Sequence, residues 1–106
     1  MTSKFRRYEI LLPLRFNDGM EVPDEYIGET LLELRTRFSA ASTETQVIKG
    51  QWEHAGSVYS DELIRAFVDV PDDADARVFF QQFKETLKMR FKQIDIWLVS
   101  YAIDIV

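Results

Sequence analysis

Cysteine is missing from all 106 residues of the chain. Its absence excludes disulfides, thiolate nucleophiles and zinc or iron–sulfur sites with cysteine ligands. Histidine is almost as scarce, since His54 is the only one. One histidine and scattered acids give no recognised metal-ligand spacing. We therefore predict that the protein uses neither a metal ion nor another cofactor.

Long apolar runs are missing as well. No stretch approaches the roughly 20 apolar residues that a membrane helix needs. The opening stretch MTSKFRRYEILLPLRF has charges within its apolar run and no small-residue cleavage site, so we expect no signal peptide. Positive charge is in deficit, and the formal net charge of −5 repels a phosphate backbone. These features predict a cytoplasmic protein that binds neither membranes nor nucleic acids.

The residues that are present have the composition of a folded globular protein. Hydrophobic residues make up 46% of the chain and aromatic residues 13%. A chain of 106 residues has the length of one domain, so we expect residues 1–106 to form a single domain with one core.

Hydrophobic periodicity predicts six elements. Alternating apolar residues predict strands over residues 5–16, 45–54, 58–70 and 94–106. Spacings of three and four predict helices over 23–39 and 71–93. The first helix contains Gly28, which we expect to allow a close approach to the sheet. The stretch AGS at 55–57 predicts a hairpin turn in which Gly56 adopts a positive φ.

The order β-α-β-β-α-β predicts a ferredoxin-like α+β sandwich. Right-handed crossovers place both helices on one face of a four-stranded antiparallel sheet. We expect the first and last strands at its centre and the hairpin strands at its edges. The last strand is apolar on both sides, and the hairpin carries Trp52 and Tyr59. We therefore expect a second copy to cover the helix-free face and form a homodimer.

The stretch KGQWEHAGSVYSDELIRAFVDV contains the best candidates for a functional site. His54 is a candidate proton-transfer group, with Asp61 or Glu62 across the hairpin to orient it. Glu53 is a poor partner because adjacent strand residues point to opposite faces. A surface histidine bonded to a neighbour is the commoner arrangement. The aromatic residues that we expect to line a pocket are Trp52, Tyr59, Trp97 and Tyr101.

Other polar clusters have simpler interpretations. Ser39, Ser42 and Thr43 have no neighbouring base and no G-x-S-x-G motif. The acids in NDG and PDDAD lack calcium-loop spacing and indicate turns and helix caps. The phenylalanines of the second helix have core spacing. A solvated helix face is predicted for the basic residues Lys84, Lys88, Arg90 and Lys92.

Three resemblances bear on function. The segment LIRAFVDVPDDADARVFFQQF looks like part of an RNA-recognition motif. We reject this identification because in its strand LIRAFVDV Arg65 is followed by Ala66, the only aromatic residue is Phe67, and there is no glycine. The plan is similar to dimeric α+β-barrel proteins, including monooxygenases that act without a metal, which implies a dimer more than an activity. YEILLPLRFNDG, the helix after VPDE, and GQWEHAGSVYSDELIRAFVDVPD together resemble a family of small uncharacterised bacterial proteins with a ferredoxin-like plan. This resemblance implies no assigned activity and assigns no functional residues.

Two hypotheses of function follow. The first is a homo-oligomeric interaction or small-ligand-binding domain without a catalytic motif. The second is a small cofactor-independent enzyme, with an aromatic pocket and His54 as its proton-transfer group.

Overall fold

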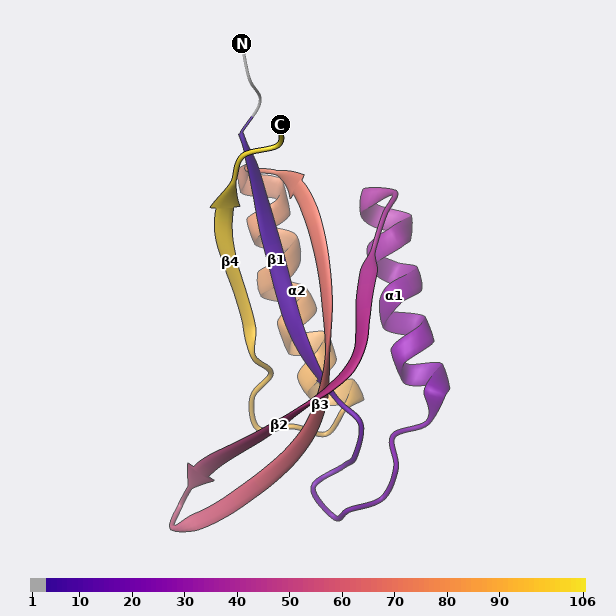
Figure 1. The fold of residues 1–106 in the computed structure, drawn as a ribbon, viewed down its shortest axis with the longest axis vertical. Helices are drawn as coiled ribbons and strands as arrows, with labels where there is room; N and C mark the ends of the chain where they lie inside the picture. The colour runs from indigo at the N-terminus through magenta and orange to yellow at the C-terminus, as the bar shows by residue number, and fades with distance from the viewer. Residues whose placement is uncertain (1–3) are drawn as a thin grey trace.

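The computed structural model describes residues 4–106, which adopt a ferredoxin-like α+β fold. The elements follow in the order β1 (Phe5–Pro13), α1 (Asp24–Phe38), β2 (Ser42–His54), β3 (Ser57–Pro71), α2 (Ala74–Arg90) and β4 (Leu98–Ile103). Figure 1 shows the strands as one twisted layer, with α2 behind it and α1 at its right. The predicted plan is confirmed, although β4 is much shorter than the strand predicted over 94–106.

The strand order in the sheet is β2-β3-β1-β4, and all neighbours are antiparallel. The prediction that the first and last strands are central was therefore wrong, because β4 is an edge strand and β3 is central. The two βαβ units explain the order. Each crossover helix joins two parallel strands that are separated by one antiparallel strand from the other unit.

The core lies between the sheet and both helices. Period-two alternation points Tyr8, Ile10 and Leu12 of β1 toward the helices, as predicted. Val68 and Ala66, the antiparallel partners of Tyr8 and Ile10 on β3, are buried beside them, and Ile64 opposite Leu12 is half-buried. The predicted stripe of α2 is buried in full and consists of Ala76, Phe80, Phe83, Leu87 and the following Phe91. Phe38 of α1 stacks on Phe80 of α2 with ring centroids 5.3 Å apart, so the helices also pack on each other.

The helix boundaries follow from local chemistry. Asp73 caps α2 because its carboxylate accepts a hydrogen bond from the backbone N–H of Ala76 at 2.8 Å. Acidic residues in the first turn of α1 and basic residues in its last turn complement the helix dipole. Gly28 does not allow a close approach to the sheet, contrary to our expectation. It is exposed, and a Cβ added there would meet no atom within 4 Å.

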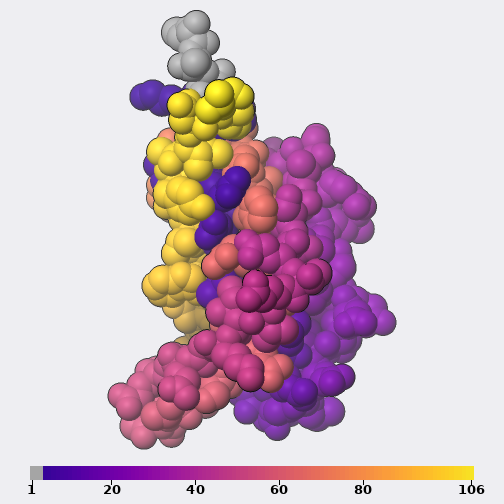
Figure 2. Space-filling view, viewed as in Figure 1, coloured from indigo at the N-terminus to yellow at the C-terminus, as the bar shows by residue number. Residues whose placement is uncertain are grey.

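The β2–β3 hairpin projects beyond the rest of the sheet. Its turn consists of Ala55 with φ 51° and Gly56 with φ 80°, which confirms the predicted positive φ at Gly56. β1 ends at Pro13, paired with Leu63, so residues 49–62 continue as a two-stranded ribbon. We call residues 49–62 the hairpin arm. Figure 2 shows the arm extending from one end of the molecule.

Within residues 4–106, neither α1 nor α2 is long and apolar enough to cross a bilayer.

Candidate ligand-binding groove beside the hairpin arm

The hairpin arm is held in shape by three side chains. Trp52 on β2 lies opposite Tyr59 on β3, and their rings stack with centroids 4.5 Å apart. The indole Nε1 of Trp52 donates a hydrogen bond to Oδ2 of Asp61 at 2.6 Å. Because an isolated two-stranded hairpin is only marginally stable in water, these contacts fix the shape of the arm near the sheet.

A cavity of about 370 Å³ lies where the arm meets the segment before β4. We call it the tryptophan groove, because Trp52 of the arm and Trp97 of that segment both line it. Most of its wall is apolar and comes from Leu11, Pro13, Leu63 and Ile96. Its polar lining is small and includes the carboxylates of Asp61 and Asp95. A largely apolar cavity of this size with few polar groups is typical of small-ligand sites.

The two carboxylates of the groove have different surroundings. Asp95 pairs with Nζ of Lys84 at 3.1 Å and accepts a hydrogen bond from the N–H of Ile96. Desolvation acts to raise the pKa of Asp95, but the hydrogen bonds and the charges of Lys84 and Lys88 together hold it below its usual value. Asp61 has no ion-pair partner among residues 4–106, and its hydrogen-bond donor is neutral Trp52.

A second cavity, of about 720 Å³, adjoins the first beside the arm. Tyr59, Asp61 and Glu62 line it together with residues of the loop after β1. Arg15 and Lys49 add positive charge to its wall, and Nε of Arg15 lies 4.0 Å from Glu62. This cavity therefore has charged groups of both signs, unlike the tryptophan groove.

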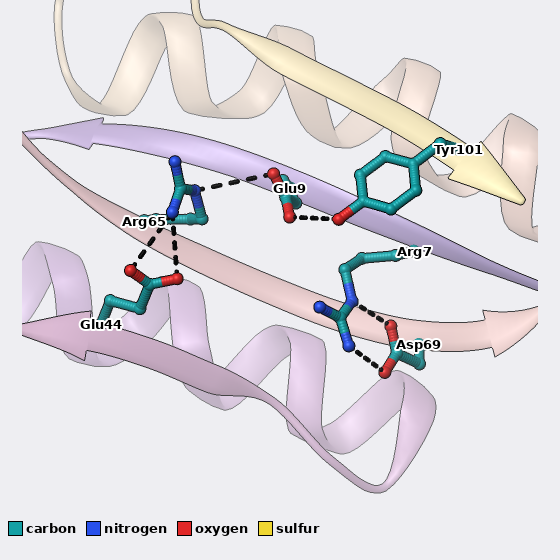
Figure 3. Close-up of polar contacts among 6 residues, drawn as sticks. All are labelled: Arg7, Glu9, Glu44, Arg65, Asp69 and Tyr101. Carbon is teal, nitrogen blue, oxygen red and sulfur yellow. Dashed lines mark hydrogen bonds and ion pairs between the residues drawn. The ribbon is translucent and has the colours of Figure 1, made fainter. Parts of the chain in front are cut away.

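The centre of the helix-free sheet face is charged (Figure 3). Arg7 and Asp69 form a two-pronged ion pair at 2.7 and 2.9 Å. Arg65 pairs with Glu44 at 3.0 Å and lies 3.6 Å from Glu9. The expectation of an apolar face therefore holds only in part, because Phe67 lies among these charges, with the Arg7 guanidinium 4.5 Å from the centroid of its ring. The reason is the strand order, since apolar β4 lies at an edge and the alternating charges of β1 and β3 occupy the centre.

Tyr101 belongs to this charged network. Its hydroxyl donates a 2.7 Å hydrogen bond to Oε1 of Glu9. This bond, desolvation and the charge of Glu9 raise the pKa of Tyr101 above its usual value, against the opposing effect of Arg7. Hydrogen bonding to Asp69 likewise raises the pKa of Arg7, and hydrogen bonding to Glu44 raises the pKa of Arg65.

The five side chains singled out from the sequence do not gather at one cavity. Trp52 and Trp97 line the tryptophan groove, while Tyr59 lines the adjoining cavity. Tyr101 lies on the helix-free face, bonded to Glu9. His54 is exposed at the end of β2, opposite Ser57, and lines neither the tryptophan groove nor the adjoining cavity. Proton transfer by His54 stays a prediction. Asp61, which we considered as a group that could orient His54, accepts a hydrogen bond from Trp52 instead.

A side chain that the sequence pattern misplaced is Arg90. It was expected on a solvated helix face, but only 11% of its side chain is exposed. Its guanidinium bonds both carboxylate oxygens of Glu33 at 2.8 and 3.0 Å and reaches the hydroxyl of Thr30 at 2.9 Å. This contact joins α2 to α1. The spacing of charges along one helix carries no information about a partner on another helix.

Metal ligands do not cluster in the described part of the chain. Among residues 4–106, no group of three histidine, cysteine, aspartate or glutamate side chains could hold a metal ion.

Comparisons with known proteins identify the fold alone. No protein-family model and no curated protein matches the chain. A solved phage SAM lyase in complex with S-methyl-5′-thioadenosine is similar, with a TM-score of 0.69, 15% identity, and coverage of 99% of this chain and 92% of that chain. CutA1 from Oryza sativa gives a TM-score of 0.66 at 9% identity, with 99% of this chain and 84% of that chain covered. CutA from Synechococcus elongatus gives a TM-score of 0.64 at 8% identity, with 96% of this chain and 79% of that chain covered.

Proposed function

We propose that this protein is a homo-oligomeric domain that binds a small ligand in the tryptophan groove. The observation that carries the proposal is the groove itself. Two tryptophans from segments far apart in sequence line one cavity of about 370 Å³, beside a carboxylate without a cationic partner. Large aromatic surface next to a few polar groups is the usual composition of a ligand site.

Self-association is supported by the helix-free face and the hairpin arm. No helix of residues 4–106 covers this face, yet its Glu9 side chain is only 20% exposed. Its arginines are already paired with acids of the same chain. A face whose charges are paired internally loses less on burial than one with isolated charges. We propose a homodimer in which a second copy covers this face.

Sedimentation velocity tests the dimer. We expect a dimer at micromolar concentration, and we expect Tyr101→Asp to shift it to monomer by placing a second acid beside Glu9 on the covered face. Val78→Asp on the helix layer is the matched control, because the two side chains have similar exposures of 44% and 50%. A wild type that remains monomeric at about 100 µM would overturn self-association, because the dimer would then be too weak for a dissociation constant in the micromolar range.

Indole NMR signals test the ligand site. The chain has two tryptophans, so its proton–nitrogen spectrum has two indole N–H signals, which Trp52→Phe and Trp97→Phe assign. We expect small-molecule ligands to shift both signals together, because both rings line one groove. The probes should include S-methyl-5′-thioadenosine, the compound held by the similar phage lyase. Ligands that bind without shifting either signal would place the site elsewhere.

The enzyme hypothesis has less support from the geometry. A general base must lie within hydrogen-bond reach of a bound substrate. His54 lines neither of the two cavities described above, so the groove has no histidine in its lining. A binding site therefore accounts better for the arrangement of these residues.

A further inference from the structure

The lining of the tryptophan groove restricts the charge of its ligand. Asp61 and Asp95 are its two ionisable side chains, and both are acids. Lys84 neutralises Asp95 at 3.1 Å, whereas Asp61 receives only the neutral N–H of Trp52 at 2.6 Å. The groove therefore holds one carboxylate whose charge is not compensated within residues 4–106. An anionic ligand would be repelled there, and the chain's net charge of −5 adds to that repulsion.

The rest of the lining restricts the chemical kind of cation that can bind. A metal ion would need several converging oxygen ligands, and no such group exists among residues 4–106. Tryptophan is the aromatic side chain that attracts cations most strongly through its ring face. Trp97 is 64% exposed, so its ring is accessible. The leucine and proline walls favour carbon substituents around the charge rather than hydrated ammonium hydrogens.

We propose that the tryptophan groove binds a small organic cation whose charge is surrounded by methyl or methylene groups. Asp61 supplies the opposite charge, and Trp52 and Trp97 supply apolar and cation–π contact. The hydrogen bond from Trp52 to Asp61 holds the carboxylate against the arm. This proposal rests on the proposed ligand-binding function and specifies the class of ligand.

A pair of isosteric probes isolates the contribution of charge. Choline and 3,3-dimethylbutan-1-ol have the same shape, but only choline carries a positive charge. We expect choline to shift both indole N–H signals saturably and to bind about tenfold more tightly than the neutral alcohol. Sodium chloride at the same ionic strength controls for general salt effects.

Two variants with the same change in net charge locate the effect. Asp61→Asn keeps an oxygen acceptor for Trp52 but removes the negative charge, and we expect choline affinity to fall about tenfold. Glu53→Gln removes one charge from the opposite face of the hairpin arm, on the neighbouring strand β2, and its choline affinity should equal that of the wild type. Circular dichroism of Asp61→Asn checks that the arm remains folded.

The outcomes separate the two proposals. If choline and the neutral alcohol shift the indole signals with equal affinity, the groove binds ligands but the cation proposal is overturned. Equal choline affinity in wild type and Asp61→Asn would overturn it in the same way. If neither compound, nor any other probe, shifts either indole signal, the ligand-binding function is overturned as well. The comparison of choline with its isostere uses the wild type alone, so it does not depend on how a variant folds.

Discussion

Tyr8 places a phenolic oxygen in the core without a hydrogen-bond partner. The residue is 3% exposed, and its ring stacks on Phe80 with centroids 3.8 Å apart. The hydroxyl is buried, and no protein atom of the described residues bonds it. A buried polar group without a partner costs about 1–3 kcal/mol. The ring therefore stabilises the core, while the hydroxyl opposes it.

We expect Tyr8→Phe to keep the free energy of unfolding unchanged or to raise it by up to about 1 kcal/mol, because it removes only the unsatisfied hydroxyl. Urea unfolding followed by circular dichroism measures the difference. Tyr8→Leu is the contrasting variant and should cost about 1–3 kcal/mol, since the stacked ring is lost. A loss of more than about 1 kcal/mol in Tyr8→Phe would show that an ordered water bonds the hydroxyl.

Because of Tyr101, we expect the stability of the folded protein to depend on pH in the alkaline range. Its pKa is raised in the folded protein because the neutral phenol donates to Glu9. Stabilisation by a group with a raised pKa is complete below its unfolded value, about 10, and is lost as pH rises through the folded pKa. We therefore expect wild-type stability to fall more steeply above pH 10 than that of Tyr101→Phe.

Tyrosinate absorbance at 295 nm checks this expectation. The titration of Tyr101 is the difference between wild type and Tyr101→Phe. Its midpoint should drop in Glu9→Gln, because the carboxylate that raises the pKa is gone. An unchanged midpoint in Glu9→Gln would contradict the assignment of the shift to that bond.

The elements themselves were largely predictable from local patterns. Alternation identified which side chains of β1 and β3 face the helices, because strand geometry has a period of two. The turn at Gly56 followed from its tolerance of positive φ. The length of β4 was not predictable, since Ile94 and Trp97 continue the alternation but precede the strand. Strand ends depend on pairing partners that the alternation does not reveal.

Two glycine substitutions, one in α1 and one in the hairpin turn, should change the free energy of unfolding in opposite directions. Gly28→Ala should raise the free energy of unfolding by about 0.5–1 kcal/mol, because Gly28 lies in a helix with free space around it. Gly56→Ala should lower it by about 1 kcal/mol or more, because Gly56 has φ 80° in the hairpin turn. Thermal unfolding of both variants measures the difference. Destabilisation by Gly28→Ala would mean that α1 packs against another surface there.

At the scale of the molecule, Arg90 of α2 adds an ion pair with Glu33 to the contact between the helices. We expect Arg90→Met to lower the free energy of unfolding by about 2 kcal/mol, because the part-buried carboxylate of Glu33 loses its bidentate partner. Lys88→Met is the matched control on the same turn of α2. Its pair with Glu85 is more exposed, so the expected loss is at most about 1 kcal/mol. Chemical denaturation compares the two, and equal losses would contradict a special role for Arg90.

The arrangement of elements in space was less predictable than the elements. The β-α-β-β-α-β order indicated the fold, but the sequence pattern suggested β4 at the centre where β3 lies. That difference decides the character of the helix-free face, because it brings Arg7 and Arg65 together with their acids. The sequence did indicate a charged face, because charged residues occupy alternate positions of β1 and β3. Which strands pair is set by contacts distant in sequence, and local periodicity does not report them.

The lining of the tryptophan groove was also only partly predictable from the sequence. The sequence indicated aromatic residues near a pocket, and it placed Trp52 and Trp97 among the candidates. Tyr101 and His54 were grouped with them, although the fold places these two elsewhere. The separation arises because the arm extends past the end of β1, which no pattern within β2 or β3 reveals.

The bulge in β2 has a consequence for fibre formation. Glu44 pairs with Arg65 and Ile48 with Leu63, so three residues of β2, 45–47, lie opposite the single residue Ile64. This irregularity interrupts the row of backbone groups on one open edge of the sheet, and the other edge, β4, is only 6 residues long. Short and bulged edges resist the strand-by-strand addition that builds amyloid. Both open edges of the sheet are therefore poor templates for the addition of a further strand.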